Sequence, residues 1–272
     1  MLEEIVARAP VFLLVAVRCF ALIMTLPLFS IRTVSRVAKV ALCGYMAYLI
    51  SPHVDFSAYS AFIADDGAFT LKYVLLLVGE GMIGVIMGFY VSIIFAAFSA
   101  AGQFFAFQMG FSASEVYDAL SQVENPLMGQ FLNLVAMLIF LQSGWAQVLF
   151  GRALVASFGT MNAFSLVAAR ADVVTYLLGG LTSLFADAFI IAIPIMGTLL
   201  LISVTMGILS KAAPMMNLMS EGFPIMILTA FFIITAIMPQ LANFFERSFA
   251  AGFDVLMRML SLGSSGAAGG GV

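Results

Sequence analysis

Long runs of apolar residues, separated by short polar or Gly/Pro-containing stretches, dominate this sequence. Six runs predict hydrophobic helices; they cover residues 11–29, 40–50, 71–109, 131–150, 173–208 and 224–245. As a helix, the third run would be about 58 Å long, because each residue adds about 1.5 Å. That is nearly twice the roughly 30 Å hydrocarbon thickness of a bilayer. The pattern therefore predicts an all-α, membrane-type chain of about six long, partly kinked helices, two of them too long for a simple span.

The composition indicates that most of this apolar surface meets lipid or protein. Of the 272 residues, 63% are hydrophobic and 9% are charged, against roughly 45–50% and about 25% in soluble domains. A soluble fold of this length could not bury so much apolar surface. The net charge of −3 provides no basic field that would attract nucleic acid. The composition therefore excludes a soluble enzyme, and it predicts contact with membrane lipid but not with nucleic acid.

Residues that could carry catalysis or hold a metal are scarce. The one histidine is His53, and the two cysteines, Cys19 and Cys43, lie within apolar runs, where we expect small buried hydrophobes. No nucleophile elbow, zinc-protease motif, phosphate-binding glycine loop or Cys-x-x-Cys pair is present. We therefore expect a protein that is not an enzyme and that has no cofactor or metal site.

The chain shows no internal repeat at a fixed period, which favours one helical domain over residues 1–262. The last ten residues, 263–272, are Gly, Ala, Ser and one Val. Such a composition is typical of a flexible end. We therefore expect one domain followed by a short tail.

Charges in the loops do not alternate as they should in a simple six-span protein. Residues 30–39 hold three basic residues and no acid, which predicts a cytoplasmic loop, and residues 51–70 hold three aspartates and neither Lys nor Arg. The loop at residues 110–126 should then be cytoplasmic, yet it has three acids and no basic residue, and the following loop holds Arg152 and Arg170. Either the charge bias is weak in later loops, or several runs pack on partner subunits instead of crossing a bilayer. The charges alone leave both hypotheses open.

Small residues recur at every fourth position of the third run, at Gly84, Gly88, Ser92, Ala96 and Ala100. Helices in lipid associate through such ridges because small side chains let two backbones approach closely. The ridge could pack within this chain or against a partner subunit, and we favour packing within the chain. In both cases this face of the helix is predicted to be tightly packed.

Three ionisable residues interrupt the apolar runs: Arg18, Glu80 and Asp187. Each is expensive in a membrane unless it is paired or hydrated, so each raises a functional hypothesis. A small-solute or ion transporter would need a chain of such groups converging on one site. Three groups on three different runs favour a buried ion pair or a side chain reaching the interface, with the partner of Arg18 open between the two acids.

Glycines and prolines interrupt the last two runs. Pro194 lies inside the fifth run and predicts a kink, because proline removes a backbone hydrogen bond. Further breaks at Gly207, Pro214, Gly222 and Pro224 surround a short apolar turn. The spacing predicts a tight helical hairpin.

Several short motifs occur in a fixed order along the chain. They are Pro27-Leu28-Phe29-Ser30 with residues 36–42, residues 101–104, Gln108-Met109-Gly110-Phe111-Ser112, residues 137–141, residues 207–209, Ala213-Pro214, Asn217, Gly222-Phe223-Pro224 and Met238-Pro239. In order and spacing they resemble those of the FliR family of flagellar export-gate proteins, whose injectisome counterparts are called SctT. The resemblance runs from about residue 11 to 260, and general similarity favours the flagellar branch.

This resemblance implies a non-enzymatic subunit of the flagellar type III export channel for unfolded flagellar proteins. In the family, one FliR joins several copies of FliP and FliQ in a helical cone, FlhB wraps the entrance and FlhA lies nearby. The assembly belongs to the basal body in the bacterial inner membrane, and much of it is raised above the membrane plane toward the periplasm. Such an assembly would explain the failed charge alternation, since apolar runs would pack on FliP and FliQ.

The resemblance also implies a pore plug in the loop that follows Gln108, Met109 and Gly110. Phe111, Val116 and Tyr117 are the bulky members of this loop. A hydrophobic closure gates by excluding water and needs no fixed chemistry. We therefore expect these residues to exclude water and ions until a substrate passes.

Three departures from the family pattern concern local geometry. The plug loop has Asp118-Ala119 where the family often has Asp-Pro, and Ser143-Gly144-Trp145 stands where it often has Asn-Gly-His. Glu221 precedes Gly222 at a usually apolar position. The first two leave the implied function intact, while Glu221 is either hydrated or paired with Lys211.

Overall fold

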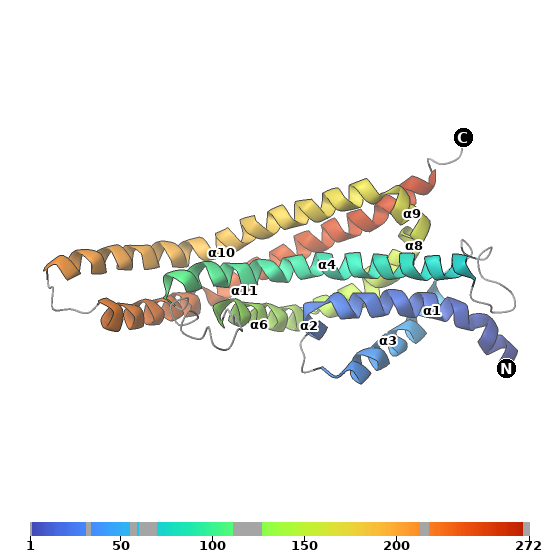
Figure 1. The fold of residues 1–272 in the computed structure, drawn as a ribbon, viewed down its shortest axis with the longest axis horizontal. Helices are drawn as coiled ribbons and strands as arrows, with labels where there is room; N and C mark the ends of the chain where they lie inside the picture. The colour runs from blue at the N-terminus through green and yellow to red at the C-terminus, as the bar shows by residue number, and fades with distance from the viewer. Residues whose placement is uncertain are drawn as a thin grey trace. The chain divides into compact units, whose positions relative to one another are not determined.

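The computed structural model describes residues 2–30, 34–54, 59, 70–110, 127–212 and 218–268, and Figure 1 shows their helices. Among the described residues there is no β-strand. All six apolar runs form helices, so the predicted all-α, membrane-type fold is confirmed. In chain order the elements are α1 (Leu2–Thr25), α2 (Pro27–Ser30), α3 (Arg36–Ile50), η1 (Ser51–His53), α4 (Leu71–Gln108), α6 (Leu127–Gln142), α7 (Trp145–Gln147), the π-helical η3 (Val148–Ala153), α8 (Leu154–Thr160), α9 (Ala163–Ala168), α10 (Arg170–Ala212) and α11 (Leu218–Ala268).

Fewer helices qualify as membrane spans than the six runs suggested. Within the described ranges, three are long and apolar enough to cross a bilayer: Leu71–Gln108, Arg170–Ala212 and Glu221–Gly263. A fourth is possible only if α6 and the residues Trp145–Thr160 count as one bent span. The helix Ala9–Thr25 is apolar but shorter.

The chain divides into two compact units. Unit 1 comprises Met1–Ile93, Gly144–Gly180 and Ala251–Val272, and unit 2 comprises Ile94–Ser143 and Leu181–Ala250. The helices α4, α10 and α11 contribute residues to both units. The units are therefore not successive domains along the chain.

In unit 1, α1 packs against α3 and against the first part of α4. The helix α3 starts at Arg36 because the extended Ser35 accepts a hydrogen bond from the Ala38 N–H through its side chain. Further along α3, the Cys43 thiol donates to the Ala16 carbonyl of α1 at 3.1 Å. Local capping and one inter-helix hydrogen bond thus fix α3 beside α1.

In unit 2, α6 lies against the second part of α4 through glycines. A Cβ added at Gly102 would meet the Met128 carbonyl and the backbone of Gly129, and a Cβ added at Gly129 would meet the Ser99 carbonyl. The two backbones therefore approach as closely as small residues permit. Around this contact the core is aromatic, with Phe95, Phe98, Phe140, Phe245 and Phe249 packed ring against ring.

Several predicted breaks lie elsewhere in the structure. The fourth run, expected to be continuous, is interrupted after Gln142, and Gly144 takes a left-handed backbone with φ of 74° that favours glycine. Gly207 lies inside α10, and Gly222 and Pro224 lie inside α11, so these residues do not end their helices. Pro214, the remaining break, lies outside the described residues.

Two further features concern α10 and α11. The helix α10 continues through Pro194, whose carbonyl accepts a hydrogen bond of 2.8 Å from the Thr198 hydroxyl. The helix α11 runs to Ala268, six residues into the stretch expected to be a flexible tail. Gly263 is buried there, and a Cβ at this position would meet the Thr160 carbonyl and Met161. Gly263 therefore packs closely against the end of α8.

Candidate functional site: a buried charge network and the root of the plug loop

Arg18 of α1 is fully buried in unit 1 and binds through three of its nitrogens. Its Nε donates to Glu80 Oε2 at 2.6 Å, and NH2 lies 2.5 Å from the same oxygen. NH1 donates to the Ser157 hydroxyl, and NH2 also donates to the Met161 carbonyl, each at 2.9 Å. The guanidinium carbon stands 4.1 Å from the centre of the Phe158 ring, a cation–π distance. Each of the three guanidinium nitrogens therefore has a hydrogen-bond acceptor.

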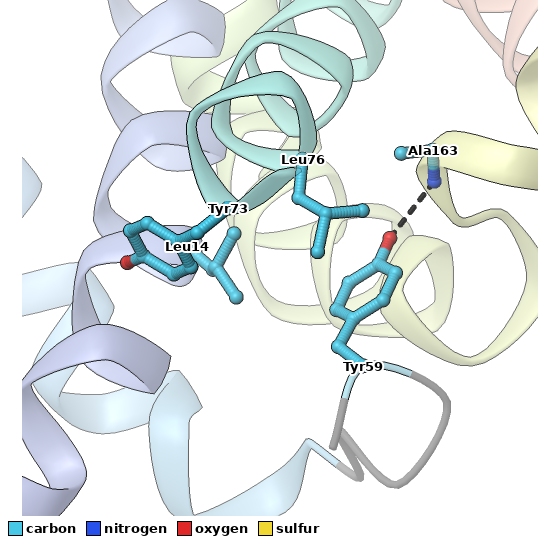
Figure 2. Close-up of a cluster of buried hydrophobic side chains, with 5 residues drawn as sticks. All are labelled: Leu14, Tyr59, Tyr73, Leu76 and Ala163. Carbon is cyan, nitrogen blue, oxygen red and sulfur yellow. Dashed lines mark hydrogen bonds between the residues drawn. The ribbon is translucent and has the colours of Figure 1, made fainter. Parts of the chain in front are cut away.

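Glu80 of α4 is equally buried and has a second donor in Tyr59. The Tyr59 hydroxyl donates to Glu80 Oε1 at 2.5 Å and accepts the Ala163 N–H at 2.8 Å. Figure 2 shows the Tyr59 ring beside Leu76, with its hydroxyl directed at the Ala163 backbone nitrogen. Burial raises the pKa of the Tyr59 hydroxyl, and the adjacent Glu80 carboxylate raises it further. Tyr59 thus stays a neutral donor to the ion pair.

The small-residue ridge divides between the two units. Its first three members face α1, since a Cβ at Gly84 would overlap the Arg18 carbonyl and a Cβ at Gly88 would overlap the Thr25 side chain. The Ser92 hydroxyl lies 2.8 Å from the Thr25 carbonyl. For these three residues the structure shows packing within the chain. In unit 2, Ala96 is exposed and Ala100 is half-buried.

Asp187 takes no part in the Arg18 network. It lies half-buried in unit 2, where its Oδ2 accepts a hydrogen bond of 3.0 Å from the Ser248 hydroxyl of α11. The partner of Arg18, open on sequence grounds, is therefore Glu80. In the described part of the chain, no group of three or more His, Cys, Asp or Glu side chains is placed to hold a metal ion.

The root of the predicted plug loop is packed in unit 2. Met109 is completely buried, and Gln108 Oε1 is buried with no hydrogen-bond partner among the residues that the structure describes. Gly110 ends α4 with φ of +83°, and a Cβ there would overlap the Phe223 ring. Two motifs from distant parts of the sequence, around Gly110 and Phe223, thus meet. The other predicted plug residues, Phe111, Val116 and Tyr117, lie outside the described residues.

Sequence reasoning missed Tyr59, Ser157, Phe158 and Met161 as members of the charge network. Tyr59 belongs to a loop, and the other three belong to a stretch without a distinctive motif. Arg18 and Ser157 are 139 positions apart. Local patterning carries no signal for such a contact.

Comparisons with known proteins agree with the fold and its motifs. The family described as "Bacterial export proteins, family 1" matches residues 9–252. The flagellar biosynthetic protein FliR of Bacillus subtilis (strain 168) is 27% identical over 263 residues, which cover 96% of this chain and 98% of that protein. FliR of Escherichia coli (strain K12) is 26% identical over 253 residues, or 90% of each chain. The surface presentation of antigens protein SpaR of Shigella sonnei is 33% identical over 171 residues, which cover 62% of this chain and 65% of SpaR.

The family match extends over residues of both compact units and includes the buried charge network and the root of the plug loop. It agrees with the motif resemblance, which also named this group of proteins. This chain therefore belongs to family 1 of the bacterial export proteins.

Proposed function

We propose that this chain assembles with FliP and FliQ into the gated channel through which a bacterium exports unfolded flagellar proteins. Its FliR relatives are flagellar biosynthetic proteins, and its long apolar helices suit a membrane. The chain is accordingly a membrane-embedded component of the flagellar export apparatus. The finer proposal is that it builds part of the channel wall, in a non-enzymatic role.

The observation that carries this proposal is the length of the exposed apolar face of α10. Within unit 2, large apolar residues are exposed along α10 from Leu181 to Leu209. The interval is about 42 Å of helix at about 1.5 Å per residue. To fit a hydrocarbon layer of roughly 30 Å, the helix would need a tilt of about 45°, beyond the roughly 0–40° seen in membrane proteins. Part of this face therefore suits a protein partner better than lipid.

The partners that suit this face are FliP and FliQ, with FlhB around the entrance and FlhA nearby. The motif resemblance suggests these partners, and the exposed apolar face of α10 supports them because a helical neighbour would cover the part that exceeds the thickness of the lipid. The complex would sit in the bacterial inner membrane as part of the flagellar basal body, partly raised toward the periplasm. Such a position explains why loop charges fail to alternate.

We assign the pore closure to the loop that begins after Gly110. Its root is held by the buried Met109 and by the contact of Gly110 with Phe223. A fixed root with bulky apolar residues beyond it suits a plug that excludes water and yields to an unfolded substrate. Phe111, Val116 and Tyr117 supply those apolar residues.

A transporter for small solutes or ions is less well supported. That function needs ionisable groups converging along a path. Here Arg18 and Glu80 pair with each other, and their other hydrogen-bond partners are neutral. These are the hydroxyls of Tyr59 and Ser157 and the Met161 carbonyl. Asp187 instead takes the Ser248 hydroxyl as its partner in unit 2.

Co-expression of the full chain with FliP and FliQ from the same bacterium, followed by purification and mass measurement, tests the proposal. We expect one complex that contains all three proteins. A chain that purifies alone or as a homo-oligomer, and never recruits FliP, would refute it. Labelling of single cysteines placed along the exposed face of α10 adds a second test, because complete protection of every position from periplasmic reagents would favour an ordinary spanning helix.

A further inference from the structure

The buried charge of Arg18 can be matched only by parts of the chain that lie far from it in sequence. Its acceptors are Glu80 of α4, Ser157 of α8 and the carbonyl of Met161, the residue that follows α8. Arg18 is 1% exposed and Glu80 is fully buried. The site that accepts the guanidinium therefore exists only when α4 and α8 are both in place beside α1.

Close packing of α1 on α4 does not itself require a charge. Gly84 and Gly88 already let the backbone of α1 approach α4, and Leu22 and Thr25 fill the space beside them. Burying an ion pair removes two charges from water, and apolar side chains of similar volume often stabilise a core equally well. The pair thus contributes little that good packing could not, whereas breaking it leaves a buried charge without a partner.

These observations indicate that the ion pair determines where α1 docks. We propose that the Arg18–Glu80 pair, completed by Tyr59 and Ser157, is a latch that makes the docking of α1 conditional on α4 and α8. Residues 11–25 of α1 carry Arg18 as their one charge. Neither lipid nor an apolar helix surface accepts that charge without a partner. The first helix of the chain therefore docks at this place only, once residues as far as Met161 have joined the unit.

The latch has an asymmetry that a purely packing role would lack. Arginine remains protonated in proteins, so Arg18 without Glu80 is a buried cation that cannot be discharged. Glu80 without Arg18 still receives a hydrogen bond from the Tyr59 hydroxyl, a neutral donor. Methionine at either position replaces the charged side chain by an unbranched apolar one. Glu80→Met should therefore loosen α1 more than Arg18→Met.

A disulfide cross-link between α1 and α4 can report docking directly. A Cβ at Gly81 would lie 3.3 Å from Val17 Cγ1, directly beside the ion pair in both helices. We would introduce Val17→Cys and Gly81→Cys into the full chain after replacing Cys19 and Cys43 with alanine. The rate of oxidative cross-linking in membranes then measures the docked fraction of α1.

With both charges present, cross-linking should be fast. Glu80→Met should slow it on the order of tenfold or more, and Arg18→Met should slow it less. The double variant Arg18→Met/Glu80→Met should cross-link faster than Glu80→Met alone, because no unpaired charge remains. Asp187→Asn, which changes the other intramembrane acid, is the matched control and should leave the rate unchanged.

Three outcomes would overturn the latch: an unchanged rate in Glu80→Met, a slower rate in Arg18→Met than in Glu80→Met, or a double variant no faster than Glu80→Met. If the Glu80→Met protein fails to accumulate in membranes, the amount of protein in the membrane is measured in place of the cross-linking rate. The double variant should then recover accumulation, and a double variant that stays absent would equally refute the proposal.

Discussion

In unit 1, a salt bridge joins α1 to α4, whereas in unit 2 aromatic rings join α4 to α6 and α11. Arg18 and Glu80 are buried among hydroxyl and carbonyl partners. Phe95 of α4 instead meets the rings of Phe140 and Phe249 at 5.3 and 5.0 Å. Both units also bring their helices close through glycines, Gly84 and Gly88 in the first and Gly102 and Gly129 in the second.

Because one unit is joined by an ion pair and the other by aromatic packing, the two units should tolerate different substitutions. Apolar packing loses stability in proportion to the volume removed and depends little on which apolar group fills it. A buried ion pair depends on both partners at once, because removing one partner leaves an unpaired buried charge, which destabilises the fold more than removing both. The stability of unit 1 should therefore depend on individual charged and polar groups, and the stability of unit 2 on the volume of its buried side chains.

The largest effect is expected in the aromatic core of unit 2. Phe245 is completely buried and contacts Phe95, Phe98 and Phe249. Phe245→Ala should lower the free energy of unfolding by about 3–5 kcal/mol, because it leaves a cavity among rigid rings. Denaturant unfolding of the purified chain in detergent measures this. Phe232→Ala, on the same helix but 75% exposed, is the control, and equal losses in the two variants would contradict the packing account.

The next effect concerns the glycine contact in unit 1. Gly88→Ala should cost about 2–3 kcal/mol, because the new methyl group meets the Thr25 side chain and the Leu22 carbonyl. Gly197→Ala, where no atom lies within 4 Å, should be neutral or slightly stabilising, since alanine favours a helix by about 1 kcal/mol. The same unfolding measurement compares them. A harmless Gly88→Ala would show that α1 does not pack closely on α4.

A smaller effect is expected at the edge of the charge network. Tyr59→Phe keeps the ring but removes the hydroxyl that donates to Glu80 and accepts from the Ala163 N–H. The loss should be about 1–2 kcal/mol, because two buried polar groups lose a partner. Tyr45→Phe, at an exposed position on α3, should change stability by less than about 0.5 kcal/mol. A neutral Tyr59→Phe would remove Tyr59 from the network.

The smallest effect is a dependence on alkaline pH. The pKa of Tyr59 is raised in the folded chain by burial and by Glu80, whereas an unfolded tyrosine titrates near pH 10, at about its reference value. The stability that comes from the neutral hydroxyl is fully present below about pH 10 and is lost as the pH rises through the folded value. Wild type should therefore lose stability relative to Tyr59→Phe in strongly alkaline solution. A gap that stays constant there would contradict the raised pKa.

The sequence was sufficient for the helices but not for the contacts between them. Apolar runs located the long hydrophobic helices, because length and hydropathy are local properties. Gly207 lies inside α10, and Gly222 and Pro224 lie inside α11, so local breaks alone did not locate the helix ends. Gly263 packs closely on the end of α8, a contact that no local pattern encodes.

The candidate site shows the same limit. Arg18, Glu80 and Asp187 stood out because charges are rare in apolar runs. Which acid pairs with Arg18 depends on helix packing across 62 positions, which no local pattern encodes. Tyr59 could not be identified for the same reason, since its hydrogen bond to Glu80 joins residues 21 positions apart.

The most direct test of the channel proposal is ion leakage through the assembled export gate. The full chain, or a chain lacking residues 111–118, would be co-expressed with FliP and FliQ, and conductance across the inner membrane would be compared at equal amounts of purified complex. The account predicts low leakage with the full chain and a clear rise in the deletion, because the loop anchored at Gly110 closes the pore. An assembled complex whose leakage is unchanged by the deletion would contradict it.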